Sequence, residues 1–447
     1  MSYASALSSL ETLNGELHAK PGAPRRKFRL DEMRTLAASL GNPERRFPSI
    51  LVAGTNGKGS TSATLASIFD AAGLRTGLYT SPHLSRVNER IRIGNAEISD
   101  DDFAATYFHV DDTAQAALLA GLLRAMPSYF EAVTATAFDY FARQQVEIAL
   151  LEVGMGGRLD ATNIVEPEIS IITDISLDHT EWLGSTIAEI ASEKAGILRP
   201  NGILVTLPQH PEANRVLAER AIELGVTAIN AAEFMPPPGT PANEPYTVVF
   251  NGEQILVDSP LHGVHQHRNV ALALAALSAI CNKNSYNITK DHIERGIRNT
   301  RWPGRLEEIR VHSRTILLDV AHNSGGAWAL RAALSARAGR PRTLLFGCLR
   351  DKAFLEMTQI LFPLFEHVLV TPVHSTRTLT LEELNSAELM AAGEYSAKEY
   401  SVCTSPTEAL ALAGKITPPD GEIVICGSVF LVGELRALLL KEAGKQL

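Results

Sequence analysis

Few cysteines and no long apolar run occur in this sequence of 447 residues. The four cysteines, Cys281, Cys348, Cys403 and Cys426, show no C-x-x-C spacing, which favours buried free thiols in a reducing cytoplasm. No stretch approaches the roughly 18 consecutive apolar residues that a membrane span requires. The N-terminal stretch MSYASALSSLETLNGEL carries acidic residues and has no basic segment before an apolar run. We therefore expect neither a membrane anchor nor a secretory signal.

An excess of basic charge is also lacking. The formal net charge is -9, which argues against a nucleic-acid binder but allows anionic small substrates held by a local cluster of Arg and Lys. Hydrophobic residues make up 45% and charged residues 20%, as in ordinary globular proteins, and the length suits about two to three domains. We expect a cytoplasmic monomer that acts on small molecules and binds neither nucleic acid nor a membrane.

Continuous apolar runs alternate with helical patterns, which indicates an α/β fold with mainly parallel sheets buried on both faces. Strands are predicted at 49–53, 76–80, 147–153 and 169–175, and helices at 58–72, 129–143 and 185–196. Residues 247–258 predict a β-hairpin, because Asn251-Gly252 separates two alternating runs.

The alternation of apolar strands and helical patterns begins again near residue 300, with strands predicted at 315–321, 343–347, 367–371 and 422–427. Pro303 and Gly304 mark the junction, so we predict two domains, 1–299 and a smaller Rossmann-like α/β domain, 300–447. A cleft between two such domains is a common ligand site.

The standard phosphate-loop pattern G-x-x-x-x-G-K-[ST] is absent, but a related stretch is present. Residues 51–61 read LVAGTNGKGST, in which Gly54 lies only three residues before Gly57. The stretch follows an apolar strand and precedes a helix, which is the context of a phosphate loop and predicts a P-loop ATPase-like N-terminal domain. Backbone N–H groups and the helix N-terminus would bind phosphates, Lys58 would contact the β- and γ-phosphates, and Ser60 or Thr61 could offer a hydroxyl. A glycine-rich turn without a ligand is the less favoured alternative.

A second motif, LLEVGMGGRLDATN, places Glu152 at the carboxyl end of a buried strand, where ligands bind in open α/β sheets. A carboxylate is costly there unless it is paired or bound to a metal, and a structural ion pair is the alternative. Gly154, Gly156 and Gly157 follow in a flexible turn. The dinucleotide fingerprint would need a glycine at Leu159, so we exclude a nicotinamide cofactor.

Three polar positions follow the next strand. Asp178 and His179, in TDISLDHTEWLG, come just after an apolar run, where a neutral imidazole and oxygen ligands suit Mg²⁺. Taken alone, however, this pair is more typical of a helix cap. Lys194, in SEKAGILRP, lies on a predicted helix, and such a lysine is usually a solvated surface residue.

Near the domain junction, Arg305 follows the turn in TRWPGRLE, and Asp319, His322 and Asn323 lie at a strand end in LLDVAHNSGG. An arginine between domains is well placed to hold a phosphate or carboxylate with two hydrogen bonds. An interface salt bridge is the alternative.

Together, GTNGKGST, TSPHL…NERI, EVGMGGRLDATN, DHTEWLG, EKAGI, RWPGRLE and D-x-AHN closely resemble the folylpolyglutamate synthase/dihydrofolate synthase family of Mur-type, ATP-dependent amide ligases. The resemblance runs from about residue 49 to 439, and several motifs in fixed order are far more specific than any one of them. Two motifs depart from the family pattern: D-G-A-H-N-P becomes D-V-A-H-N-S with Val320 and Ser324, and GILKDK becomes GCLRDK. The catalytic side chains survive both changes.

The resemblance implies a role for each matching residue. It implies ATP contacts at Gly54, Thr55, Asn56, Gly57, Lys58, Gly59, Ser60, Thr61, Asn269, Arg305 and Asp319. It implies Mg²⁺ ligands at Ser81, Glu152 and His179, with a second Mg²⁺ bound through a carbamylated Lys194. It implies substrate contacts at Gly154, Met155, Gly156, His322 and Ser428, the last two on the glutamate side. Lys58, Lys194, His179 and Glu152 are the implied catalytic residues.

The implied reaction is ATP-dependent addition of L-glutamate to dihydropteroate, to reduced folates or to both, through an acyl phosphate, with release of ADP and phosphate. Pterin recognition is expected before the phosphate loop and around SYFEAVTA (128–135). The segment at 24–43 does not match a pterin site residue by residue, so a bifunctional and a monofunctional folylpolyglutamate synthase both remain open.

Three other classes fit less well. A peptidoglycan-type Mur ligase would need a nucleotide-sugar-binding domain before the phosphate loop, and only 53 residues precede Gly54. A GTPase would need N-K-x-D, and the nearest string, NKNS at 282–285, lacks the Asp. A non-catalytic relative is disfavoured because Lys58, Glu152, His179 and Lys194 are all retained.

Overall fold

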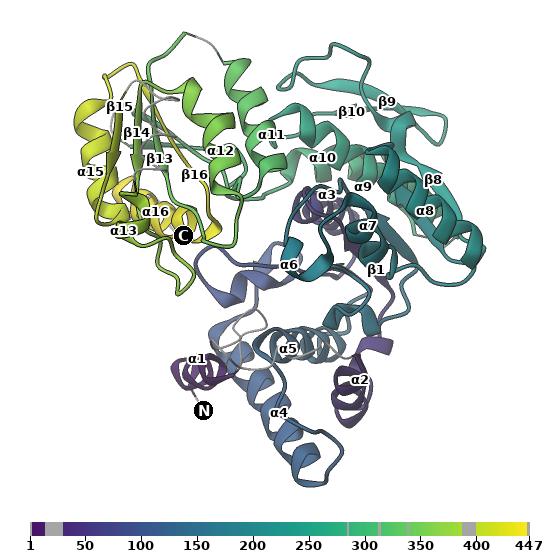
Figure 1. Ribbon diagram of the computed structural model, residues 1–447. Helices are drawn as coiled ribbons and strands as arrows, with labels where there is room; N and C mark the ends of the chain where they lie inside the picture. The colour runs from purple at the N-terminus through teal and green to yellow at the C-terminus, as the bar shows by residue number, and fades with distance from the viewer. Residues whose placement is uncertain are drawn as a thin grey trace.

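Two mainly parallel β-sheets, each covered by helices, make up the structure (Figure 1). The computed structural model describes residues 2–13, 30–283, 286–311, 314–337, 339–386 and 399–444. Elements up to α10 build the first sheet and its helices, called here the N-terminal unit, and elements from β11 onward build the C-terminal unit. The predicted α/β class with two mainly parallel sheets is confirmed.

The larger sheet is parallel over six neighbouring strands and ends in two antiparallel ones. Its eight strands are, in spatial order, β4 (Ala96–Glu97), β3 (Ile91–Ile93), β2 (Thr76–Tyr79), β5 (Ile148–Glu152), β1 (Ser49–Ala53), β6 (Ile169–Ile172), β7 (Ile203–Thr206) and β8 (Thr227–Asn230). Because β1 lies between β5 and β6, the loop that follows β1 sits at the switch point of the sheet, where ligands bind in such folds.

Helices cover both faces of this sheet. They are α1 (Tyr3–Thr12), α2 (Leu30–Ser39), α3 (Lys58–Ala71), α4 (Asp100–Leu119), α5 (Tyr129–Arg143), α6 (Thr180–Leu183), α7 (Ile187–Ala195), α8 (Pro211–Leu224), α9 (Val264–Lys283) and α10 (Lys290–Asn299). Alternate residues of β1 enter different cores: Leu51 packs with α4 and α5, whereas Ile50 packs with α3, α9 and α10. This is the period of a strand buried on both faces, as the apolar run predicted.

The predicted hairpin is present as β9 (Tyr246–Phe250) and β10 (Glu253–Val257). Its inward side chains join the α9 core.

The C-terminal unit repeats the three-layer arrangement on a smaller scale. Its strands lie in the order β11 (Glu307–Val311), β12 (Arg314–Leu318), β16 (Glu422–Cys426), β13 (Arg342–Phe346), β14 (His367–Val370) and β15 (Glu399–Val402), and only β11 pairs antiparallel. Its helices are α11 (Ser324–Ser335), α12 (Phe354–Leu361), α13 (Leu381–Leu384), α15 (Pro406–Ile416) and α16 (Val429–Glu442). Helices α11 and α12 pack on one face, and α15 and α16 on the other.

Every strand and helix predicted by residue range is found, within about three residues at each end. The short strands β3, β4, β7, β8, β11 and β15 were not predicted, because their burial is partial and their sequence pattern is weak. In the described part of the chain, no helix is long and apolar enough to cross a membrane. Residues 24–29 of the N-terminal segment and 284–285 of the NKNS string lie outside the described residues.

Candidate active site

Two glycines of the loop after β1 lie where a Cβ would clash with a neighbouring side chain. Gly57 precedes α3 with φ 92°, and a Cβ there would lie 2.2 Å from Oδ1 of Asn269. A Cβ on Gly54, at φ 151°, would lie 1.8 Å from Oγ1 of Thr173. Backbone hydrogen bonds fix the loop to the segment that follows β6. The amides of Thr55 and Asn56 donate to the carbonyl oxygen of Asp174, at 2.8 and 3.2 Å. The first amides of α3 have no acceptor within the helix, so they can bind an anion.

Two lysines converge on this loop. Nζ of Lys58 donates to the Gly54 and Thr55 carbonyls at 3.2 and 3.1 Å, and Nζ of Lys194 donates to the Gly54 carbonyl at 2.7 Å. Lys194 is 3% exposed, so the expectation that it is a solvated surface residue is wrong. Burial, helped by the charge of Lys58, lowers the pKa of Lys194 to about 7. Lys194 can therefore present a neutral amine near neutral pH.

Glu152 and Ser81 bring two unpaired oxygens to the same place. Glu152 ends β5 and is 5% exposed. Oε2 of Glu152 and Oγ of Ser81 are buried without a hydrogen-bond partner in the described chain. Burial raises the pKa of Glu152 to about 7, against the opposing charges of Lys58 and Arg305. Within the described residues Glu152 forms no ion pair shorter than 4.0 Å, which leaves its cost of burial to be offset by a ligand.

His179 lies beside these groups in a neutral form. Burial, with the charge of Lys352, lowers the pKa of His179 to about 3. His179 occupies the position before α6 with φ 50°, but its side chain makes no cap hydrogen bond. The helix-cap alternative is therefore wrong for this imidazole, which stays neutral and can bind a metal.

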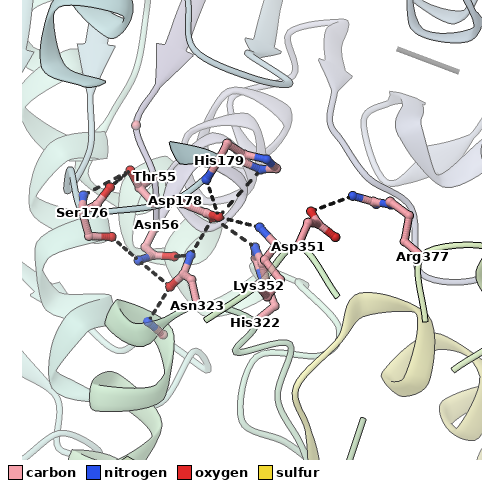
Figure 2. Close-up of polar contacts among 12 residues, drawn as sticks. Thr55, Asn56, Ser176, Asp178, His179, His322, Asn323, Asp351, Lys352 and Arg377 are labelled. Carbon is pink, nitrogen blue, oxygen red and sulfur yellow. Dashed lines mark hydrogen bonds and ion pairs between the residues drawn. The ribbon is translucent and has the colours of Figure 1, made fainter. Parts of the chain in front are cut away.

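Asp178 reaches across to the C-terminal unit (Figure 2). Its carboxylate lies 2.5 Å from Nζ of Lys352 and 2.9 Å from Nδ2 of Asn323. Burial works against ionisation, but the charges of Lys352, His179 and His322 hold the pKa of Asp178 well below its ordinary value. Asp178 is therefore an ionised contact between the units.

The C-terminal unit contributes two further predicted residues, Asp319 and His322. Asp319 is buried, and its carboxylate accepts from the amides of Leu306 and Ala321 at 3.0 and 2.9 Å. Burial raises the pKa of Asp319, opposed by Arg305. Nδ1 of His322 donates to the Val320 carbonyl at 2.8 Å, so Nε2 is left as the acceptor of a neutral ring.

A cavity of about 310 Å³ unites these groups between the two units. The predicted residues that line it are Gly54, Thr55, Asn56, Gly57, Lys58, Gly59, Ser60, Ser81, Glu152, Gly154, Met155, Gly156, His179, Lys194, Asn269, Arg305, Asp319 and His322. Thr61 does not line it and is buried within α3.

A second cavity, of about 540 Å³, adjoins the first and shares Ser81, Met155, His179 and His322 with it. Ser428, which precedes α16, lines this one, together with Tyr129 and Phe130 from the SYFEAVTA stretch. The second cavity therefore has aromatic side chains from both units, since Phe430 of the C-terminal unit also lines it.

Sequence reasoning missed two cations of the second cavity, Lys352 and Arg377. Lys352 was visible within GCLRDK but had no assigned role, and Arg377 carried no local signal. Both depend on how the C-terminal unit docks, which no local pattern reveals.

Comparison with known proteins defines the class first. The Mur ligase middle domain model matches residues 52–277, and the model of the Mur ligase glutamate ligase domain matches residues 304–429. The two matches cover most of the N-terminal unit and most of the C-terminal unit, so the chain belongs to the Mur ligase class.

Whole-chain relatives narrow the class. The chain is 32% identical to a dihydrofolate synthase/folylpolyglutamate synthase of Bacillus subtilis, over 92% of this chain and 94% of that protein. It superimposes on Mycobacterium tuberculosis folylpolyglutamate synthase complexed with ADP with a TM-score of 0.83, at 30% identity and 98% coverage of both chains. For E. coli FolC in complex with DHPP and ADP, the TM-score is 0.80, at 30% identity and 99% coverage of both. The chain belongs to the dihydrofolate synthase/folylpolyglutamate synthase family, as its motifs indicated.

Proposed function

We propose that this protein joins L-glutamate to dihydropteroate and to reduced folates in an ATP-dependent reaction that forms an amide and releases ADP and phosphate. The observation that carries the proposal is the meeting of Lys58, Lys194, Glu152 and Ser81 around one cavity between two units. Relatives over nearly the whole chain, with structures bound to ADP and DHPP, support the same reaction. In this proposal residues 1–299 bind ATP and the acid, and residues 300–447 bind glutamate and add Arg305 and Asp319 to the nucleotide cavity.

The nucleotide would bind with its phosphates at the start of α3. The free amides there and Lys58 supply positive charge, and Asn269, Arg305 and Asp319 line the same cavity. Lys58 now donates to two loop carbonyls. It would turn from them to the γ-phosphoryl group and stabilise the charge that moves onto the acid.

The donor set fits Mg²⁺. Oγ of Ser81 and Oε2 of Glu152 are buried oxygens without a partner, and His179 is neutral, as a metal ligand must be. No three His, Cys, Asp or Glu side chains of the described chain gather into a metal site by themselves, so the set depends on the serine hydroxyl and on phosphate oxygens. Bound Mg²⁺ supplies neutralisation of phosphate charge.

Lys194 would complete a second Mg²⁺ site as a carbamate. Addition of CO₂ to its Nζ needs a neutral amine, forms an N–C bond and releases one proton. The buried, low-pKa Lys194 beside the loop meets that requirement.

The acyl-transfer step follows from the shape of the site. An oxygen of the substrate carboxylate attacks the γ-phosphorus of ATP, and ADP leaves. The amine of glutamate, held near His322 and Ser428, then attacks the acyl carbon and expels phosphate. Enclosure of the cavity between the two units would exclude the water that hydrolyses an acyl phosphate. We further propose that the enzyme works as a cytoplasmic monomer.

Oxygen-18 transfer tests this path. With both carboxylate oxygens of the pterin acid labelled, one labelled oxygen should appear in each phosphate released, because that oxygen bridges carbon and phosphorus in the acyl phosphate. Phosphate without label during normal amide formation would contradict the proposed intermediate.

A further inference from the structure

Four residues form a polar contact between the units, and we call Asn56, Asp178, Asn323 and Lys352 the interdomain bridge (Figure 2). Asn56 and Asp178 line the first cavity, and Lys352 lines the second. Asn56 and Asp178 belong to loops of the N-terminal unit. Asn323 precedes α11, and Lys352 follows β13 in the C-terminal unit.

The side chain of Asp178 forms an ion pair and a hydrogen bond with residues of the C-terminal unit. The side chains of Asp178 and Lys352 are 8% and 6% exposed, and Nδ2 of Asn323 donates to the other oxygen of Asp178. Separation of the units would leave both charges without their partners, and breaking such a pair from one side is costly. The bridge therefore favours the docked arrangement.

Asn56 ties this contact to the phosphate loop. Its amide group exchanges two hydrogen bonds with the amide group of Asn323, at 3.3 and 3.1 Å. The start of α11 approaches so closely that a Cβ on Gly325 would lie 2.8 Å from Nδ2 of Asn56. The backbone of Asn56 is itself bound to Asp174, so the loop position and the docking of α11 are one connected arrangement.

We propose that Lys352 and Asn323 are positioning residues for the nucleotide, acting through Asp178 and Asn56 rather than by contact. Lys352 lines only the second cavity, whereas the nucleotide cavity draws walls from both units, including Arg305 and Asp319. A ligand that needs both walls binds with an apparent affinity set by the fraction of docked molecules. The bridge raises that fraction, so nucleotide affinity depends on a lysine outside the nucleotide cavity. The inference rests on the proposed function only in taking the first cavity as the nucleotide site.

The test is calorimetric titration of the full-length protein with ADP and Mg²⁺. Lys352→Met and Asn323→Ser should each weaken ADP binding by about fivefold or more, the usual lower range for coupling between sites. Serine keeps a cap for α11 but cannot make the two amide contacts, and this change leaves the net charge unaltered. Lys352→Arg keeps a cation for Asp178 and should restore most of the affinity.

Arg350→Met is the matched control. It removes one positive charge two residues from Lys352, but Arg350 pairs with Glu383 inside the C-terminal unit and lines neither cavity. It should stay within about twofold of wild type, the effect of an exposed pair.

Wild-type ADP affinity in folded Lys352→Met and Asn323→Ser would overturn the inference while leaving the proposed function intact. If Lys352→Met does not fold, wild-type ADP affinity in folded Asn323→Ser would overturn the inference, and Lys352→Arg then serves as the variant that keeps the charge. A wild-type protein that binds no ADP would overturn both.

Discussion

At the scale of single residues, two buried groups of the site have pKa values displaced toward neutrality. Lys194 and Glu152 both have a pKa of about 7, with burial as the main cause. Such groups cost stability and are concentrated where a protein binds or transforms a ligand.

The pKa of Lys194 leads to a prediction for its carbamate. Protonated amine predominates below about pH 7 and neutral amine above it, so carbamylation at constant dissolved CO₂ should rise through that pH. Carbon-13 NMR of protein exposed to labelled CO₂ should show one carbamate signal that Lys194→Ala removes. The same variant should lose activity and regain part of it with short carboxylates. Wild-type turnover by Lys194→Ala without added carboxylate would refute the carbamate.

Glu152 gives a second prediction at this scale. Glu152→Gln keeps the shape but removes the charge that would face the metal, so the Mg²⁺ concentration for half-maximal activity should rise by about tenfold or more. Glu147→Gln, just before the opposite end of β5, is the control, since the Glu147 carboxylate accepts from the Arg75 amide near the surface and lines neither cavity. An equal Mg²⁺ requirement in both variants would argue against Glu152 as a ligand.

At the scale of elements, the glycines at the start of α3 decide the shape of the phosphate loop. Gly57→Ala would force a Cβ into a positive φ and against Asn269, so ADP affinity should fall. Gly73→Ala, just after the same helix at φ +83°, has nothing within 4 Å of the added Cβ. Both variants should lose about 1 kcal/mol of stability from backbone strain, but only Gly57→Ala should lose nucleotide binding. Calorimetric titration and thermal melts separate the two effects.

Elements also show what sequence could predict. The central strands were found because a strand buried on both faces is apolar throughout, and the loops that follow β1, β5 and β6 were placed together because parallel strands end at one edge. The residue pattern alone favoured a surface position for Lys194, and only the family resemblance singled it out, although it continues the buried stripe of Ile190 and Ala191 on α7. Helical spacing of four residues from Ile190 was the available signal.

At the scale of the whole molecule, the site is complete only where the two units meet. Arg305, Asp319 and His322 reach the cavity from one unit, and the phosphate loop reaches it from the other. Contacts such as Asp178–Lys352 join residues 174 positions apart, and they could not be predicted because docking of two folded units leaves no local pattern.

Lys58→Ala should abolish ADP formation while the fold and the docking of the two units persist, as circular dichroism and thermal melts would show. Normal turnover in that variant would refute the phosphate-loop assignment.

The most direct measurement is ADP release with Mg-ATP and L-glutamate, in parallel with dihydropteroate and with tetrahydrofolate. Our account predicts release that requires glutamate and occurs with both acids, in equal amounts with the amide product. Turnover with tetrahydrofolate alone would make the enzyme a monofunctional folylpolyglutamate synthase. Turnover with neither acid, from well-folded protein, would contradict the central claim that this site is a folate-type glutamate ligase.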